Sequence, residues 1–223
     1  MTAPSGKKVA LNAAGEVGGG YLDISCGTVF SVDHTSLATS ECDSSYLPDP
    51  AVEGTRAALQ TEVSAYLADK YSSDESAGCV YAKDGKMVVI LTGEKANLKN
   101  FWSGKWNSVW TISVNAGEAE VAGEIKILAH YFEDGNMQLN TSKPVSAKKI
   151  GSAGSDADLA KAIVAHITEA ESAVQMGLES MYANMGEQTL RAMRRVMPIT
   201  RNKMEWNVFS VRMVRQTQAG KKA

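Results

Sequence analysis

Two patterns of apolar and polar residues predict the regular elements in the first part of the body. Over residues 51–70 apolar side chains recur at steps of three and four, which predicts an amphipathic helix. Residues 79–141 instead contain short β-rich runs separated by turn sequences, which predict about five strands. We expect these strands at residues 79–82, 87–91, 108–114, 123–132 and 137–141. Because the connections are short, the strands should form an antiparallel meander.

The longest predicted element is a helix that begins near Ser155, where Ser155 and Asp158 resemble a capping box. Between Leu159 and Met185 the apolar residues follow a 4-4-3-4-4-3-4 spacing. This spacing predicts one continuous helix that reaches Val196 and stops at Pro198. At ~1.5 Å per residue, about 40 residues span ~60 Å. Five strands ~4.8 Å apart give a sheet only about 25 Å wide. The helix should therefore overhang its own sheet and lie on a second subunit.

The first 50 residues are less regular than the rest. Residues 9–11 and 21–24 have the character of short strands, and the glycine-rich residues 15–20 between them predict a flexible turn. A phosphate loop is the weaker alternative, because no G-K-[ST] follows. Residues 36–50 are polar and predict a linker or long loop. We expect a segment of short strands and loop (1–50), an α+β body (51–188) and a C-terminal tail (189–223).

Charge separates the tail from the rest of the chain. Residues 189–223 contain nine Lys or Arg and one acid, Glu205, whereas the other 188 residues contain 14 basic and 24 acidic side chains. Apolar residues run between the basic ones. Such a segment is suited to docking on an acidic surface of protein, lipid or nucleic acid. The alternative is a solvated basic tail beside the end of the long helix.

Nothing in the sequence indicates catalysis, a metal site or a cofactor. There is no catalytic or nucleotide-binding fingerprint, no apolar run long enough to span a membrane and no secretory leader. The odd number of cysteines predicts reduced cytosolic thiols at Cys26, Cys42 and Cys79. The histidines lack metal-ligand spacing and should be structural or on the surface; they are His34, His130 and His166.

A cluster of aromatic residues precedes and enters the third strand of the meander. It comprises Phe101, Trp102, Trp106 and Trp110. These rings have the character of a stacking platform for nucleotides. Few basic residues lie nearby, so we favour the alternative that they fill the core beneath the long helix.

Three stretches match one known family in order and spacing. They are NFWSGKWNSVW (100–110), HYFEDGNMQL (130–139) and LRAMRRVMPITRNKMEWN (190–207). They resemble the F-actin capping protein α subunit, with a match over roughly residues 66–215 and only a faint one before it. The resemblance implies a heterodimer with a similar β subunit, with a homodimer as the alternative. The sheets of both chains would join into one antiparallel sheet, crossed by long helices.

The resemblance also implies a function. The dimer would bind the barbed end of actin filaments and block subunit addition and loss, as a cytoplasmic, non-enzymatic protein of the cytoskeleton. The alternatives are an actin-related filament such as that of dynactin, or a basic module that binds phosphoinositides or another polyanion. Family members usually begin with a further small helical bundle, which we expect this chain to lack.

The tail is where the resemblance places the actin contacts. The expected actin-binding residues are Arg191, Arg194, Arg195, Arg201, Lys203 and Trp206. Arg191 stands where the family usually has lysine, which keeps the charge but offers a planar fork in place of a point donor. Acidic phosphoinositides are expected to compete with actin for the same basic surface.

Overall fold

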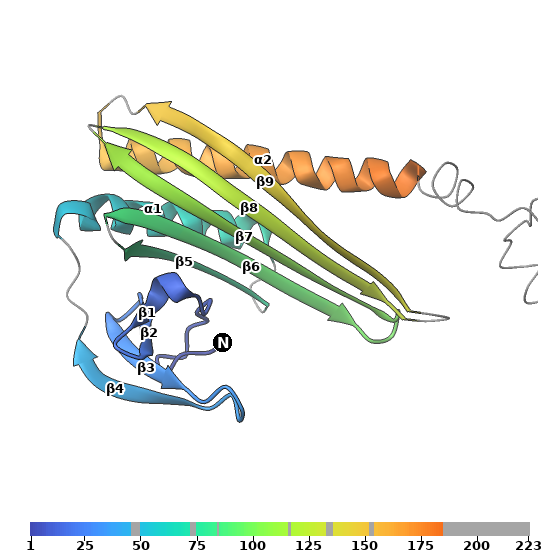
Figure 1. Ribbon diagram of the computed structural model, residues 1–223, viewed down its shortest axis with the longest axis horizontal. Coiled ribbons are helices and arrows are strands. Elements are labelled where there is room, and N and C mark those ends of the chain that lie inside the picture. Colours follow the sequence, from blue (N-terminus) through green and yellow to red (C-terminus); the bar gives the residue numbers. More distant parts are fainter. Residues whose placement is uncertain are drawn as a thin grey trace, which may run out of the picture. The chain divides into compact units, whose positions relative to one another are not determined.

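The computed structural model describes residues 1–45, 50–71, 75–83, 85–115, 117–132, 136–151 and 154–184 (Figure 1). The chain divides into two compact units, Met1–Glu171 and Ser172–Ala223. In the second unit the described residues are 172–184. No helix among the described residues is long and apolar enough to cross a membrane.

The first unit is built on a five-stranded sheet with the order β5-β6-β7-β8-β9, in which each strand is antiparallel to its neighbours (Figure 1). The predicted α+β fold with an antiparallel meander is therefore confirmed. A tight hairpin joins β5 to β6, because Lys83 pairs with Lys86. The strands are β5 (Ser76–Lys83), β6 (Lys86–Asn97), β7 (Trp102–Asn115), β8 (Glu118–Tyr131) and β9 (Met137–Gly151).

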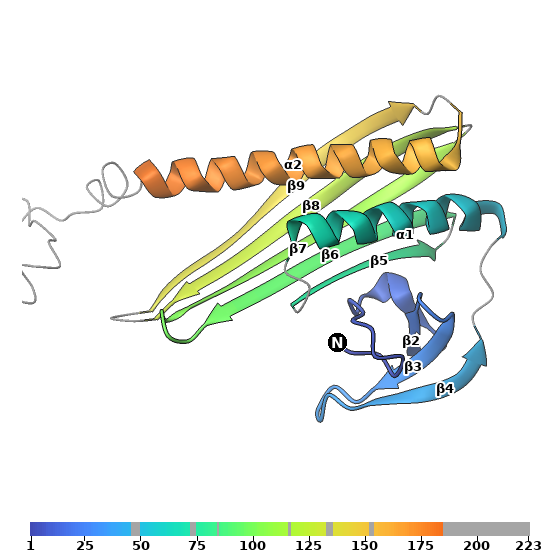
Figure 2. The same ribbon diagram turned by 180° about the vertical axis from the view of Figure 1, so that it is seen from behind.

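Two helices pack on one face of this sheet, α1 (Pro50–Lys70) and the part of α2 (Asp156–Asn184) that belongs to the first unit (Figure 2). Gly78 of β5 lies directly beneath Leu67 and Val63 of α1, where a larger side chain would collide. The capping box of α2 is confirmed, since the Ser155 hydroxyl accepts the backbone N–H of Asp158 at 3.2 Å. The predicted continuation to Val196 lies outside the described residues.

The opposite face of the sheet carries the N-terminal segment. This segment forms a short 3-10 helix and a four-stranded sheet of β1 (Glu16–Val17), β2 (Gly20–Asp23), β3 (Thr28–Val32) and β4 (Thr39–Ser45). Its apolar residues share one core with Cys79, Tyr81 and Ile90 of the larger sheet. The Tyr81 hydroxyl donates to the carbonyl of Ala10 at 3.1 Å, which ties the N-terminal segment to the larger sheet.

The structure corrects three expectations for individual elements. Residues 9–11 belong to no strand, and β4 occupies part of the region predicted as linker or loop. β9 continues ten residues beyond the predicted end at Thr141, to Gly151. The glycine-rich turn is confirmed as a tight turn between β1 and β2, with positive φ at Gly18 and Gly19.

The aromatic cluster divides between core and surface. Trp110 is fully buried, and its ring meets His166 of α2 edge-on at 6.2 Å between centroids. The core interpretation is therefore confirmed for Trp110. Phe101 instead keeps 41% of its surface exposed, because it lies in the turn between β6 and β7.

Leu37, between β3 and β4, adopts a left-handed backbone conformation with φ of 58° while its side chain is 66% exposed. This conformation costs a residue with a Cβ atom about 1–2 kcal/mol. Leu37→Gly is therefore expected to raise the free energy of unfolding by about 1 kcal/mol in urea titrations. Leu37→Ala is the control, because it removes the exposed side chain but keeps Cβ. Equal stabilisation by both variants would contradict the prediction.

Candidate functional site

The outer edge of β9 is the longest open strand edge of the described structure. β9 spans 15 residues, is the last strand of the sheet and pairs with β8 along its length. Within the described ranges no strand pairs with its other side. The backbone N–H and C=O groups along such an edge can accept a strand from another chain.

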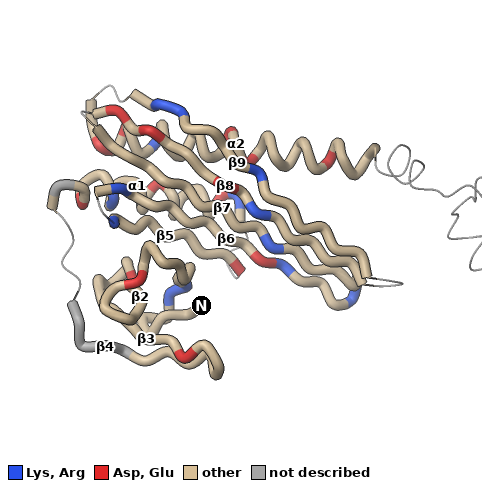
Figure 3. Tube along the Cα trace, viewed as in Figure 1, with Lys and Arg blue, Asp and Glu red and all other residues tan. Residues whose placement is uncertain are grey.

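The sequence of β9 limits non-specific pairing along this edge. It carries three lysines, Lys143, Lys148 and Lys149, and no acidic residue (Figure 3). Pro144 lacks a backbone N–H to donate. A bulge also interrupts the ladder, because Ser146 and Ala147 lie opposite the single residue 122 of β8. Lysine, proline and bulges are the usual protection of an exposed strand edge.

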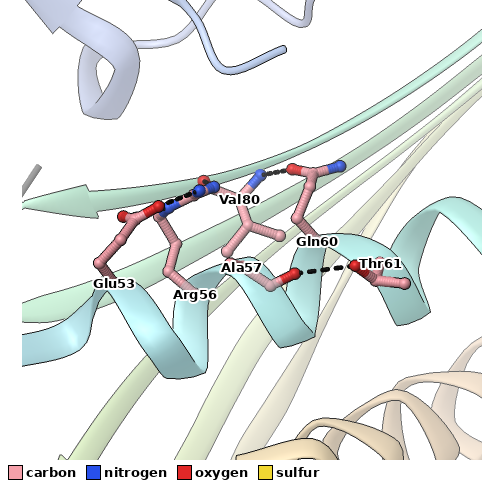
Figure 4. A network of polar contacts seen from close by, with 6 residues as sticks. All are labelled: Glu53, Arg56, Ala57, Gln60, Thr61 and Val80. Carbon is pink, nitrogen blue, oxygen red and sulfur yellow. Dashed lines mark hydrogen bonds and ion pairs between the residues drawn. The ribbon is translucent and has the colours of Figure 1, made fainter. Parts of the chain in front are cut away.

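The opposite edge of the sheet, at β5, is covered by side chains of α1 (Figure 4). Gln60 accepts the backbone N–H of Val80 at 2.8 Å and donates to the carbonyl of Gly78 at 3.1 Å. Arg56 donates to the carbonyl of Val80 at 3.3 Å. The outward N–H and C=O of Val80 and the carbonyl of Gly78 are thus already used within the chain.

Glu53 holds Arg56 in place, with a bond from Arg56 Nε to Glu53 Oε2 of 2.7 Å. The hydrogen bond from Arg56 lowers the pKa of Glu53 more than partial burial raises it. The ion pair therefore persists at neutral pH, and it keeps the guanidinium at the strand edge.

Gln60→Leu is expected to lower the free energy of unfolding by about 1–3 kcal/mol, because it leaves the N–H of Val80 and the carbonyl of Gly78 without their partner. Chemical denaturation measures this loss. The matched control is Gln138→Leu on β9, whose amide bonds Asn136 at the surface. The prediction fails if both variants lose equally little.

The described part of the second unit exposes large apolar side chains of α2. Met176 is 64% exposed and Tyr182 is 46% exposed. By contrast, Leu159, Ile163 and Ile167 in the first unit are buried. The predicted apolar stripe is thus buried at its start, whereas its later member Met181 is 38% exposed. Exposed apolar side chains on a helix are expected where the helix meets another chain.

A second apolar surface lies at the end of the sheet where β8 meets β9. Tyr131 and Met137 face each other across this pair and both are exposed. The ring of Phe101 meets that of Phe132 edge-on at 6.0 Å, and Phe132 donates its backbone N–H to the carbonyl of Phe101 at 2.8 Å. Exposed apolar residues therefore adjoin the open edge of β9.

Charged groups connect α2 to β9 behind this edge. Lys148 Nζ lies 3.6 Å from Glu169 Oε2, and His166 Nδ1 lies 4.0 Å from the same oxygen. Burial lowers the pKa of His166, the positive charge of Lys148 lowers it further, and Glu169 opposes them. His166 therefore remains neutral in the folded chain near neutral pH.

The stability of the chain is expected to fall on acidification through the ordinary histidine range. The unfolded chain has the ordinary histidine pKa of 6.5, so below that pH it binds a proton that the folded chain resists. The loss continues until the pH passes the lower pKa of the folded state. Thermal melts at about pH 7.5 and about pH 5.5 measure it. His166→Phe should reduce the difference, whereas the control His34→Gln, at an exposed site, should not.

Every predicted actin-binding residue lies outside the described residues. The structure therefore leaves the placement of Arg191, Arg194, Arg195, Arg201, Lys203 and Trp206 as predicted from the sequence. Among the described residues no group of three or more His, Cys, Asp or Glu side chains is arranged to hold a metal ion. The free thiols in that part of the chain are Cys26, which is exposed, and Cys79, which is buried.

The sequence did not indicate the two features that define the sheet edges. Beyond residue 141, where the predicted strand ends, the apolar residues of β9 are only Val145, Ala147 and Ile150, in a run of Ser and Lys. The contacts of Arg56 and Gln60 with β5 join residues 18 to 24 positions apart. No local pattern reveals contacts of that separation.

Comparison with known proteins identifies the family. The sequence profile of the F-actin capping protein alpha subunit matches residues 2–216. A Caenorhabditis elegans F-actin-capping protein subunit alpha is 34% identical over 209 residues, covering 90% of this chain and 72% of the relative. The Chaetomium thermophilum subunit of the same name is 30% identical over 203 residues, covering 91% of this chain and 70% of the relative.

A solved structure shares the fold. The homodimeric actin capping protein alpha subunit from Plasmodium berghei superposes with a TM-score of 0.69 at 24% identity, over 83% of this chain and 72% of that one. The family match begins at residue 2, so it extends through the N-terminal segment where the resemblance was faint. The predicted resemblance is confirmed, and this chain belongs to the F-actin capping protein alpha subunit family.

Proposed function

We propose that this chain is one subunit of a dimer that caps the barbed ends of actin filaments, with the β9 edge as the subunit junction and the basic tail as the actin contact. The observation that carries the proposal is the family match over residues 2–216. Membership of this family also confirms the prediction of an actin-binding protein that is not an enzyme.

Three features of the described residues support a dimer. β9 leaves a 15-residue edge open. Exposed apolar residues adjoin that edge at Tyr131 and Met137, and α2 exposes Met176 and Tyr182. A second subunit that added a strand at β9 and covered these side chains would bury apolar surface worth roughly 25 cal/mol per Å².

The partner is a capping protein β subunit or a second copy of this chain. The relatives are alpha subunits by name, which favours the heterodimer. The Plasmodium berghei protein of the same fold is homodimeric, which keeps the second copy as the alternative. Light scattering on the purified complex, compared with the 23.8 kDa of one chain, shows whether the complex contains two chains. Mass spectrometry of the gel bands then shows whether the two chains are identical or different.

The tail is the actin-binding element of the proposal. Its basic residues would make charge-assisted hydrogen bonds to acidic residues near the barbed end, and Trp206 would add an apolar anchor. Because a phosphoinositide headgroup presents similar negative charge, vesicles that contain it should compete with actin. This activity would place the protein in the cytoplasm with the cytoskeleton.

The test is seeded elongation of actin filaments in the presence of the purified dimer. We expect the parent dimer to stop growth at barbed ends, and a dimer lacking residues 189–223 to leave growth unchanged. Capping by the tail-less dimer would refute the role of the tail. A parent dimer that bound phosphoinositide vesicles without altering growth would favour a polyanion-binding module. Co-purification with an actin-related filament would favour service in a dynactin-like assembly.

A further inference from the structure

A carboxylate is buried where α1, α2 and the sheet meet. Glu171 of α2 is only 2% exposed. Its Oε2 accepts the hydroxyls of Tyr66 at 2.7 Å and Tyr71 at 2.8 Å, and its Oε1 accepts the hydroxyl of Ser108 at 2.5 Å. The donors come from α1, from the residue that follows α1 and from β7. One side chain of α2 is thus bonded both to the end of α1 and to β7.

The two tyrosine hydroxyls that bond Glu171 are fixed in orientation and stay protonated. The rings of Tyr66 and Tyr71 meet edge-on at 6.0 Å between centroids, which orients both hydroxyls. Burial, together with the carboxylate of Glu171, raises the pKa of each tyrosine well above its ordinary value. Both phenols therefore stay protonated. No Lys, Arg or His within the described ranges forms an ion pair with Glu171.

Stability alone does not account for this carboxylate. Leu159, Ile163 and Ile167 are buried at steps of four along α2, and Glu171 is the next residue in that series. A buried ionised group usually costs more than an apolar side chain of similar size at the same position. Buried polar groups are best attested as devices that fix the register of packed helices.

The apolar stripe cannot fix the register of α2 by itself. If α2 slid by four residues, just over one turn or ~6 Å, Ile163 would replace Leu159 and Ile167 would replace Ile163. These exchanges are nearly neutral in volume. The same slide would move the carboxylate of Glu171 away from its three hydroxyl donors and leave them without an acceptor. The polar contact therefore distinguishes the two registers far more strongly than these two exchanges do.

We propose that Glu171 is a positioning residue, whose bonds to Tyr66, Tyr71 and Ser108 fix the register of α2 on the sheet. Its effect on capping rests on the proposed function, because register sets how the rest of α2 and the tail are presented. The register itself is independent of actin, so it is measured without actin.

A disulfide between α1 and α2 reports the register. Thr55 Oγ1 donates to Asp156 Oδ1 at 2.9 Å, so cysteines at these two positions mark the observed register. Cysteines at positions 55 and 160 mark the register shifted by four residues. In the full chain with its partner, we expect the parent background to form the first disulfide and not the second. Peptide mapping by mass spectrometry identifies each product.

The fourfold variant Glu171→Leu, Tyr66→Phe, Tyr71→Phe, Ser108→Ala replaces the network by apolar groups. In this variant we expect a disulfide to form at both cysteine pairs, 55 with 156 and 55 with 160, whereas the parent forms only the first. Glu171→Gln, tested in parallel, keeps the side-chain size and should likewise form both disulfides. If the fourfold variant does not fold, the result for Glu171→Gln alone tests the proposal. Tyr21→Phe, whose hydroxyl contacts His34, is the control and should match the parent. Parent-like products from both variants would overturn the proposal. If a variant capped weakly but kept the observed register, only the proposed link between register and capping would be contradicted.

Discussion

Reversing the charge of two tail residues, Arg195→Glu with Arg201→Glu, is expected to weaken capping by about 100-fold while the dimer stays intact. A charge-assisted contact that is desolvated at an interface is typically worth a few kcal/mol, and reversal adds repulsion from the acidic actin surface. Dissociation should accelerate where the contact is buried, and association should slow where it lies at the rim. Seeded elongation across a range of dimer concentrations measures the affinity.

The matched control for charge reversal is Lys7→Glu with Lys8→Glu. Both lysines are exposed in the N-terminal segment, so this variant makes the same change in net charge away from the tail. It should cap as tightly as the parent. If the control and the tail variant weakened capping equally, net charge rather than specific contacts would be responsible. Tight capping by the tail variant would contradict the assignment of Arg195 and Arg201.

Trp110→Ala is expected to lower the free energy of unfolding by about 3–5 kcal/mol, the largest effect on stability that we anticipate. Trp110 is fully buried at the centre of the sheet. Its ring lies against Gly123 on β8, where any side chain would collide with it. Removing the ring therefore opens a cavity that Gly123 cannot fill. Denaturant titration at fixed protein concentration measures the loss, since dimerisation shifts apparent stability.

Trp110→Phe separates the loss of volume from any loss of hydrogen bonding. The indole N–H of Trp110 has no hydrogen-bond partner within the described residues, so phenylalanine removes volume alone and should cost clearly less than alanine. Phe101→Ala at the exposed turn serves as the second comparison. A Trp110→Ala variant no less stable than Phe101→Ala would show that the centre of the sheet repacks.

The elements that the sequence predicted well are those whose signals are local. The capping box at Ser155 located the start of α2, and the β-rich runs at residues 79–82 and 87–91 located β5 and β6. The latter half of β9 was missed because its Lys, Ser and Pro residues resemble a loop. Pairing with β8 makes it a strand, and such tertiary pairing outweighs intrinsic preference. β4 was missed for the same reason, since β3 supplies its partner.

The candidate site was predictable in kind but not in detail. An over-long apolar stripe indicated a second subunit, and the exposure of its member Met181 agrees with that expectation. Glu171 gave one visible signal, an acid four residues after Ile167 in the stripe, but its donors Tyr66 and Ser108 are 105 and 63 residues away. Which charges contact actin remains a prediction from the tail sequence.

The β5 and β9 edges of the larger sheet differ in whether their backbone groups can pair with another strand. This difference limits how many chains can join by strand pairing. Arg56 and Gln60 occupy outward backbone groups of Val80 and Gly78 on the β5 edge, whereas no strand of the described residues pairs with the outer side of β9. If the larger sheet gains its neighbour at β9, as proposed, a neighbour built alike has then used the same edge. Growth by strand addition at the larger sheet would therefore stop at two chains. A protein that ends the growth of another polymer would in this way be prevented from polymerising itself.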